Sequence, residues 1–521
     1  MKKQPEWVAG KPVTTITETS AGSSRAAAAC LCALFAAANG AVAFRHAMWR
    51  DEWMPLNVAR FATDVNDWFA EIKYIGRWAF FGLIWLIEQC GGHPWLFKLV
   101  IVSISTLGVY IVCRHAPFSW PQKSLFAFGY YPFYEYGTIL RDYSIIWTTT
   151  MACCALLASP RRRPLAFGLV LAVLFQTNPF GLGLGCAFGA AYVFDLWRAA
   201  RTGGEAIDHT AVFGGAIVAA ASFLMALKTM MPPPEIAEIV LGQPLRSDSH
   251  LIRLMESLPF PTRAWLPIPM FGTWNSQILD PWPWAQIAIG AAITALVMGI
   301  VRLEATAAFL FGIGMLCLGA ILCHVPWTAL RYHGPYFLLL VCAYWILEAR
   351  SPDDATVREW WPTWRRAYGV RKLLFTGLLL VHTVVAAVFV AQEQVVPFSG
   401  SREAARIIRE NEPPDVPIVG DPDYAMISLC GHLDKEVYIA SRREPGAFTR
   451  VDKRRRGTPL SPDELSAVVR ERLSTEKRDV VLVTNYPINM PAEMGALLGV
   501  TNSITDERYH IYRIRYRRSA E

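Results

Sequence analysis

The sequence predicts a polytopic helical membrane protein that carries a small α/β domain at its C-terminal end. Of its 521 residues, 53% are hydrophobic and only 18% are charged, which is too apolar a balance for a soluble globular protein. Apolar stretches close to the length that crosses about 30 Å of hydrocarbon recur through residues 26–392 and then stop. The last segment, residues 393–521, has the mixed composition of a domain that folds in water.

The first 25 residues are polar, and we expect them to form a cytoplasmic tail. The apolar run that follows, from Ala26 to Phe44, has no clear small-residue cleavage site, so it is predicted to be an uncleaved first span. The expected organisation is therefore a tail (1–25), a membrane domain (26–392) and an extracytoplasmic domain (393–521).

Basic residues gather in short loops such as SPRRRP (159–164) and RRAYGVRK (365–372). The positive-inside rule places such loops in the cytoplasm, which leaves the C-terminal domain outside. With the basic loops fixed, eleven spans are predicted, at residues 26–44, 95–113, 124–139, 144–158, 165–177, 181–197, 211–228, 284–301, 306–323, 335–348 and 373–392.

Two outer segments are long. In the first outer loop, residues 45–94, the apolar stretch 73–89 would reverse every later loop if it crossed, so it is predicted to lie in the outer leaflet. Before it, apolar side chains recur at steps of three and four over residues 52–73, which predicts an amphipathic helix on the membrane surface; a packed surface helix of the protein is the structural alternative. The second long loop, residues 229–283, is rich in Pro and Trp and could cover a bound donor as a lid.

Charge and cysteine usage exclude other classes. A net charge of +7 is modest and is explained by the cytoplasmic loops, so no nucleic-acid partner is predicted. Most of the eleven cysteines fall inside predicted spans, and only Cys430 lies in the C-terminal domain. This distribution argues against a disulfide framework and against a Cys/His metal site.

The acidic pair Asp51 and Glu52 follows directly on the first span. A charged side chain at membrane depth costs roughly 2.5 to 3.5 kcal/mol, so such residues are usually kept for function. The structural alternative is a helix start, with Asp51 as the cap and Pro55 in the first turn. The two roles are compatible.

Five motifs in a fixed order carry a family resemblance: RDEW (50–53), KYIGRWAFFGLIWL (73–86), FGYYPFYEYGTILRDYS (128–144), QTNPFGLGL (176–184) and RYHGPYFLLL (331–340). Together they resemble the GT-C class of integral-membrane glycosyltransferases, which includes protein O-mannosyltransferases and the aminoarabinose transferase of lipid A. The sequence departs from the pattern where it has Ile75, Arg77 and Trp78 in place of an acidic residue and a His-Pro pair. The resemblance therefore assigns no catalytic role to that stretch.

The resemblance implies an inverting transferase in the bacterial cytoplasmic membrane, with its C-terminal domain in the periplasm. The donor would be a polyprenyl-phosphate-linked sugar, and the acceptor a glycan, a lipid or a protein. Asp51 would be the general base, and Glu52 would orient Asp51 or bind acceptor. No cofactor is expected, although Asp51, Glu52, Glu135 and Asp142 could alternatively gather around Mg²⁺ or Mn²⁺.

The departing phosphate needs a cation, because negative charge develops on it. We expect Arg141 in this role, since a guanidinium donates two parallel hydrogen bonds to phosphate; an ion pair with Glu135 or Asp142 is the structural alternative. Arg331, His333 and Tyr143 are further donor-binding candidates, although His333 could simply satisfy backbone groups. The possible supporting residues are Glu135, Asp142, Asn178 and His324.

Two other functions remain open. An O-antigen ligase or polymerase would run similar chemistry from a pyrophosphate-linked donor, and would place its Arg and His in a late outer loop such as 324–335. A lipid-linked glycan transporter or flippase would need charges along the bundle interior, where the predicted spans have few.

In the C-terminal domain, SREAARIIREN and SPDELSAVVRERLS predict helices, the second with a capping box of Ser461 and Glu464. PIVGD, EVYIA and RDVVLVTN predict strands, and the alternating ERYHIYRIRY predicts an edge strand. The basic run KRRR (453–456) is interpreted as a solvated patch, with contact to acceptor or anionic lipid as the alternative. The domain as a whole is expected to bind acceptor or to pack over the active site.

Overall fold

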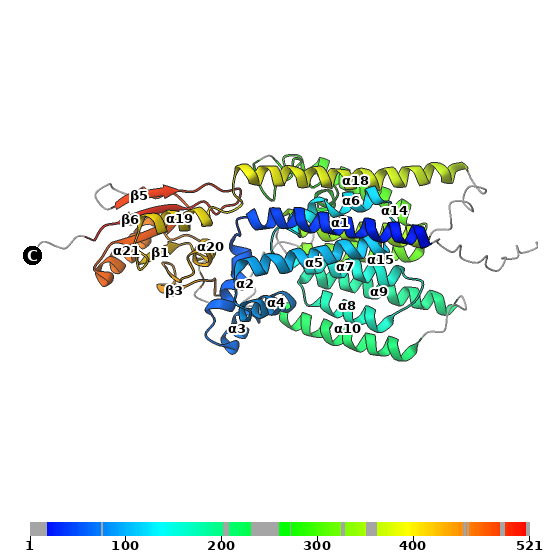
Figure 1. The fold of residues 1–521 in the computed structure, drawn as a ribbon, viewed down its shortest axis with the longest axis horizontal. Coiled ribbons are helices and arrows are strands. Elements are labelled where there is room, and N and C mark those ends of the chain that lie inside the picture. The colour runs from blue at the N-terminus through cyan, green and yellow to red at the C-terminus, as the bar shows by residue number, and fades with distance from the viewer. Residues whose placement is uncertain are drawn as a thin grey trace, which may run out of the picture.

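The structure is a computed structural model that describes residues 18–73, 77–201, 208–230, 260–270, 272–324, 329–350, 362–450, 452, 455, 458–489 and 495–516. The molecule is elongated, with a bundle of long helices at one end and a smaller sheet-containing domain at the other (Figure 1). In the described part of the chain, seven helices are long and apolar enough to cross a membrane. The chain is thus a multi-pass helical membrane protein with a small C-terminal α/β domain, as predicted.

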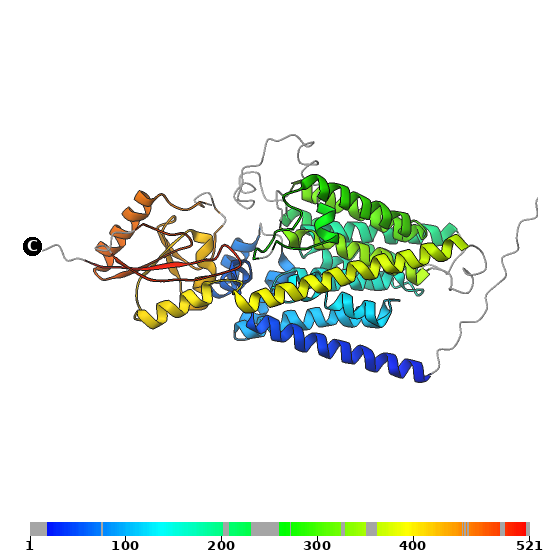
Figure 2. The same cartoon turned by 90° about the horizontal axis from the view of Figure 1, so that it is seen from above.

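The bundle helices run side by side in two perpendicular views (Figures 1 and 2). Apart from 124–139, each predicted span coincides with one of them: α1 (Glu18–Arg45), α5 (Pro94–His115), α7 (Tyr143–Ala158), α8 (Pro164–Phe175), α9 (Pro179–Arg201), α10 (His209–Met230), α14 (Pro283–Val301), α15 (Ala305–His324), α16 (Gly334–Arg350) and α18 (Pro362–Val395). A short helix, α13 (Phe260–Trp265), precedes α14.

The predicted span 124–139 is wrong as a continuous helix. The chain forms α6 (Trp120–Ala127) and then a π-helical turn, η1 (Tyr130–Glu135), which contains Pro132. The tyrosine side chains of η1 are fully buried and reach polar partners: Tyr130 donates to Glu135 at 2.7 Å and Tyr134 to Glu393 at 3.0 Å. Irregular backbone at membrane depth is tolerated where it is buried in protein in this way.

The predicted surface helix over 52–73 is also wrong. The segment forms two helices, α2 (Arg50–Phe61) and α3 (Val65–Ile72), because the Asp64 side chain caps a new helix by accepting from the N–H groups of Asn66 and Asp67. Helix α2 is buried between the bundle and the C-terminal domain. Helix α4 (Trp78–Gln89) packs against α2 at the same end of the bundle (Figure 1).

The C-terminal domain is a mixed six-stranded sheet in the order β3-β2-β1-β4-β6-β5. Strand β1 is parallel to β2 and β4, and the remaining pairs are antiparallel. Its elements are α19 (Ser401–Asn411), β1 (Ile418–Asp421), α20 (Asp423–Leu433), β2 (Val437–Ile439), β3 (Glu444–Gly446), α21 (Pro462–Glu476), β4 (Val480–Thr484), β5 (Gly495–Val500) and β6 (His510–Ile514).

Both predicted helices of this domain are confirmed, and α21 starts with the expected capping box of Ser461 and Glu464. The edge position predicted for ERYHIYRIRY is wrong, because β6 lies inside the sheet, between β4 and β5. Of the KRRR run, only Arg455 falls within the described residues; it lies 3.9 Å from Asp423.

One hydrophobic core joins the two parts of the molecule. It contains Leu56 of α2, Phe80 of α4 and Phe97 of α5 together with residues of α19, α20 and the sheet. In addition, the Asn57 amide donates at 2.8 Å to the carbonyl groups of Ile427 and Ala447. The C-terminal domain is therefore packed rigidly on α2, the helix whose first turn carries Asp51.

Candidate active site

Three segments that are distant in the sequence meet at the end of the bundle that faces the C-terminal domain. They are the first turn of α2, the segment between η1 and α7, and the short helix η2 (Leu330–Tyr332). Their charged residues Asp51, Arg141 and Arg331 form a cluster in which one carboxylate lies between two guanidinium groups. Nη1 of Arg141 is 2.7 Å from Oδ2 of Asp51, and Nη2 of Arg331 is 3.5 Å from the same oxygen.

Burial and charge differ within this cluster. The Arg141 and Arg331 side chains are only 3% and 6% exposed, whereas that of Asp51 is 30% exposed. Burial opposes ionisation of the carboxyl group, but the neighbouring guanidinium groups, Arg141 first, lower the pKa of Asp51 to about 2. The carboxylate is ionised at neutral pH and is the part of the cluster that water or substrate can reach.

Arg141 and Arg331 each have N–H groups that make no hydrogen bond to a described residue. Among the described residues, the buried Nε atoms of Arg141 and Arg331 and Nη1 of Arg331 have no hydrogen-bond partner. Nη2 of Arg331 donates to the Tyr332 hydroxyl at 2.9 Å. Because buried N–H groups without acceptors are costly, this arrangement is suited to an anion that supplies the missing oxygen atoms.

Glu52 does not share the face of Asp51. It is fully buried and its oxygens accept from the N–H groups of Trp49 (2.9 Å) and Leu140 (2.7 Å). Glu52, rather than Asp51, thus provides the side-chain cap of α2, and it also ties α2 to the backbone beside Arg141. Through Leu140, Glu52 is bonded to the backbone of the residue that precedes Arg141.

His46 completes the network behind Glu52. Its Nε2 lies 2.9 Å from Glu52, and its Nδ1 lies 2.6 Å from Glu393 at the end of α18. Burial opposes protonation, but Glu393 and Glu52 together raise the pKa of His46 to about 9. The imidazolium therefore links α1, α2 and α18 behind the cluster.

Asp142, which follows Arg141 in the chain, forms a second polar pair with Asn178. The Asn178 amide donates to Asp142 at 2.7 Å, while its oxygen caps α9 by accepting from the N–H groups of Phe180 and Gly181. Nε of Arg77 lies 3.7 Å from Asp142, and the Arg77 charge also acts on Asp51. The 73–86 motif thus adds a cation to the site at the position where its sequence departs from the family pattern.

Aromatic rings enclose the arginines. The Tyr143 ring lies 5.6 Å from the Arg141 guanidinium and stacks on Tyr136. The Arg331 guanidinium lies 5.0 Å from the Trp274 ring and 5.4 Å from the Trp49 ring. These cation–π contacts hold the guanidinium planes without using their N–H groups.

Trp274 comes from the long outer loop, and sequence reasoning did not single it out. Its Nε1 donates to Glu135 at 3.2 Å, and its ring contacts Trp49. Glu135 is buried and also accepts from Tyr130, so it does not pair with Arg141 as the structural alternative proposed. The Pro- and Trp-rich composition of the loop was the only signal in the sequence.

His333 and His324 were the two histidines that the sequence suggested for the site. His333 is buried directly after η2, with its backbone N–H bonded to Leu330. His324 ends α15, and its side chain lies outside the described residues. Within the described ranges, no group of three or more His, Cys, Asp or Glu side chains is arranged to hold a metal ion.

Arg50, the residue before Asp51, is bonded to two acidic residues of the C-terminal domain. The Arg50 guanidinium donates to both oxygens of Asp506 at 2.9 Å, and the Arg50 backbone N–H donates to Glu507 at 2.8 Å. Glu507 is fully buried and also accepts from Ser399 and Ser428. Burial raises the pKa of Glu507 to about 7, although Arg50 and the hydroxyl groups oppose the shift.

The sequence and the structure were compared with those of known proteins. No protein-family model and no curated protein matches the sequence. ArnT from Cupriavidus metallidurans matches over 92% of this chain and 97% of its own, at 14% identity, with TM-scores of 0.46 bound to undecaprenyl phosphate and 0.47 in the apo state. The arabinofuranosyltransferase AftD from Mycobacteria matches over 93% of this chain and 40% of its own, at 12% identity and a TM-score of 0.35.

Because the TM-scores lie below 0.5, the function is argued below from the residues of the site.

Proposed function

We propose that the protein is an inverting glycosyltransferase that moves a sugar from a polyprenyl-phosphate carrier to an acceptor hydroxyl at the outer face of the bacterial cytoplasmic membrane. One observation carries the proposal: the buried guanidinium groups of Arg141 and Arg331 flank the partly exposed carboxylate of Asp51 and retain unused N–H donors. Two cations and one anion leave the cluster with an excess positive charge. This excess positive charge suits a bound phosphate that carries one negative charge, as a phosphodiester does.

Arg141 and Arg331 are proposed to bind the phosphate. A guanidinium has five N–H donors on a planar fork, so one edge of Arg141 can hold Asp51 while another edge holds the phosphate. The same groups stabilise the negative charge that grows on the phosphate oxygen as the glycosidic bond breaks. The aromatic walls of Trp49, Trp274 and Tyr143 keep bulk water from screening this charge.

Asp51 is proposed to be the general base. The acceptor oxygen bonds to the anomeric carbon, its proton passes to the Asp51 carboxylate, and the bond to phosphate breaks to release the polyprenyl phosphate. With a pKa of about 2, Asp51 is a weak base in the empty site. A phosphate that shares its guanidinium partners and repels the carboxylate raises this pKa, so Asp51 becomes an effective base when the donor is bound.

The proposed orientation follows from the basic loops of the sequence. By the positive-inside rule, these loops support a position outside the cytoplasm for the end of the bundle that carries Asp51 and for the C-terminal domain. A polyprenyl donor would then bring its phosphate to the end of the bundle from the surrounding bilayer.

The test is complementation of a strain that lacks the gene. Its envelope glycans would be compared by mass spectrometry with those of the same strain carrying the native protein, Asp51→Asn, or Asp64→Asn. The last variant removes a carboxylate from the same outer segment and keeps a side chain that caps α3. We expect the native protein and Asp64→Asn to restore the missing glycan, and Asp51→Asn to fail at equal expression. Full restoration by Asp51→Asn would rule out Asp51 as the base.

A further inference from the structure

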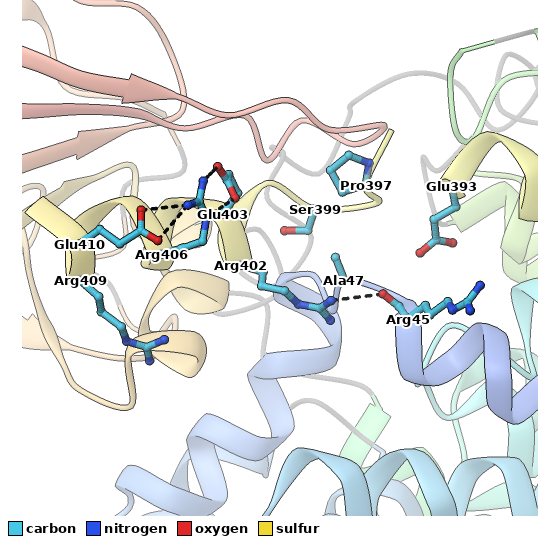
Figure 3. A pocket seen from close by; sticks show the side chains of 10 residues that line it. All are labelled: Arg45, Ala47, Glu393, Pro397, Ser399, Arg402, Glu403, Arg406, Arg409 and Glu410. Atoms are coloured by element: carbon cyan, nitrogen blue, oxygen red, sulfur yellow. Dashed lines mark hydrogen bonds and ion pairs between the residues drawn. The ribbon is translucent and has the colours of Figure 1, made fainter. Parts of the chain in front are cut away.

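A second polar site lies outside the cluster of Asp51, Arg141 and Arg331. A cavity of about 610 Å³ opens where α1 and α18 end, and residues of α19 line its other side. Figure 3 shows Arg45 at the end of α1, Glu393 on α18, and Arg402, Arg406 and Arg409 along α19. None of the residues that line this cavity belongs to that cluster.

The charges around the cavity are unequally compensated. Arg406 pairs with both Glu403 and Glu410, and Glu393 pairs with His46. These contacts account for every carboxylate that lines the cavity, so the remaining arginines have none to share.

The other three arginines contact only neutral oxygens among the described residues. Arg45 donates to the side chain of Gln394 at 3.4 Å. Arg402 donates to the carbonyl groups of Arg45 and His46, and Arg409 donates to the carbonyl of His432. The cavity therefore carries three positive charges without a carboxylate partner, all on exposed side chains.

The position of the cavity indicates where a matching anion would come from. Helices α1 and α18 are two of the seven helices able to cross a membrane, and Arg45 and Val395 are their last residues. Phe44 and Val395 at these ends are 47% and 83% exposed, which places apolar side chains directly beside the arginines. Apolar surface next to uncompensated arginines is the pattern expected where acyl chains give way to headgroups.

We propose that this cavity binds the phosphate headgroup of an anionic phospholipid, whose acyl chains lie along α1 and α18. The guanidinium groups of Arg45, Arg402 and Arg409 supply the charge, and Arg402 in addition joins the headgroup site to the backbone before α2. The site is independent of the transfer reaction, so it can exist whether or not the proposed function is correct.

The test is native mass spectrometry of the full chain in detergent, titrated with phosphatidylglycerol, phosphatidylcholine or soluble glycerol phosphate. We expect preferential retention of phosphatidylglycerol. In Arg45→Gln and Arg409→Gln, apparent affinity should fall by roughly fivefold for each removed charge, and the corresponding Lys variants should bind nearly as the native protein does. Arg402 is left unchanged because its loss would remove two hydrogen bonds to the backbone between α1 and α2.

Arg470→Gln and Arg515→Gln serve as matched controls, since they remove two exposed positive charges of the same domain away from the cavity. Unchanged phosphatidylglycerol binding in a variant that carries both Arg45→Gln and Arg409→Gln would overturn the site. Equal retention of phosphatidylcholine by the native protein would overturn the anionic specificity. Equal binding of glycerol phosphate would show a soluble phosphate site rather than a lipid site. The comparison of lipids on the native protein remains decisive if the variants unfold.

Discussion

The guanidinium of Arg141 lies 2.7 Å from the carboxylate of Asp51, although 90 positions separate the two residues in the sequence. This ion pair joins the first turn of α2 to the segment that precedes α7, at the end of the bundle next to the C-terminal domain. Because each group sets the charge environment of the other, a change at either residue should alter both phosphate binding and proton transfer.

Arg331→Gln should raise the pKa of Asp51, since it removes one of the four arginines, with Arg141, Arg50 and Arg77, whose charges lower that pKa. The acidic limb of the pH–rate profile of the transfer reaction should move to higher pH. The measurement is the release of polyprenyl phosphate as a function of pH, with the donor identified from the glycan missing in the gene-deleted strain. An acidic limb that stays in place would mean that Asp51 is not the group that titrates.

Glu52→Gln should weaken the positioning of Arg141 without touching the reacting atoms. An amide group keeps one acceptor oxygen but presents an NH₂ group to either Leu140 or the Trp49 and His46 donors. We expect a loss of about 1–3 kcal/mol in unfolding free energy and weaker binding of undecaprenyl phosphate. Glu471→Gln, an exposed position on α21, is the control. Native affinity in Glu52→Gln would contradict the positioning role.

The buried Glu507 should make stability depend on pH. Its folded-state pKa of about 7 lies above the ordinary value of 4.5, so the folded state holds the proton more tightly. The contribution is fully present below pH 4.5 and is lost as the pH rises through about 7. Thermal unfolding of native protein and Glu507→Gln across this window should give a smaller pH dependence in the variant; equal slopes would refute the assignment.

Trp274→Phe and Trp274→Ala should separate two roles of this side chain. Phenylalanine keeps a ring over Arg331 but removes the hydrogen bond to Glu135, whereas alanine removes both. We expect a small effect of Phe and a fall of tenfold or more in kcat/KM with Ala, because water then reaches the arginines (a lost cation–π contact is worth roughly 1–2 kcal/mol). Equal activities of the two variants would mean that the ring does not cover the site.

Most of the bundle helices could be predicted from the sequence, because a long apolar stretch is enough to indicate a membrane-spanning helix. The prediction failed at 124–139, where the same apolar composition forms α6 and η1; the partners that allow this, Glu135 and Glu393 among them, are set by tertiary contacts. The break between α2 and α3 was signalled by the cap at Asp64 and was masked by the regular apolar spacing on either side.

For the site, residue types and the resemblance selected Asp51, Arg141 and Arg331, which the structure brings together. They could not give the separation of Asp51 from Glu52, because only the fold shows which N–H groups each carboxylate faces. Arg77, Trp274 and the anchoring of Arg50 by Asp506 were missed for the same reason: each contact joins segments that have no common local pattern.

The most direct test of the central claim is the affinity of the purified protein for undecaprenyl phosphate, followed by the change in total intrinsic tryptophan fluorescence, in Asp51→Asn and Arg141→Gln. If Asp51 and the phosphate share Arg141, Asp51→Asn should bind at least as tightly as the native protein, since it removes a competing anion, while Arg141→Gln should bind roughly 10- to 100-fold more weakly, the loss expected for a charged hydrogen bond of about 1.5–3 kcal/mol. Unchanged affinity in Arg141→Gln, or a loss of equal size in both variants, would contradict the account.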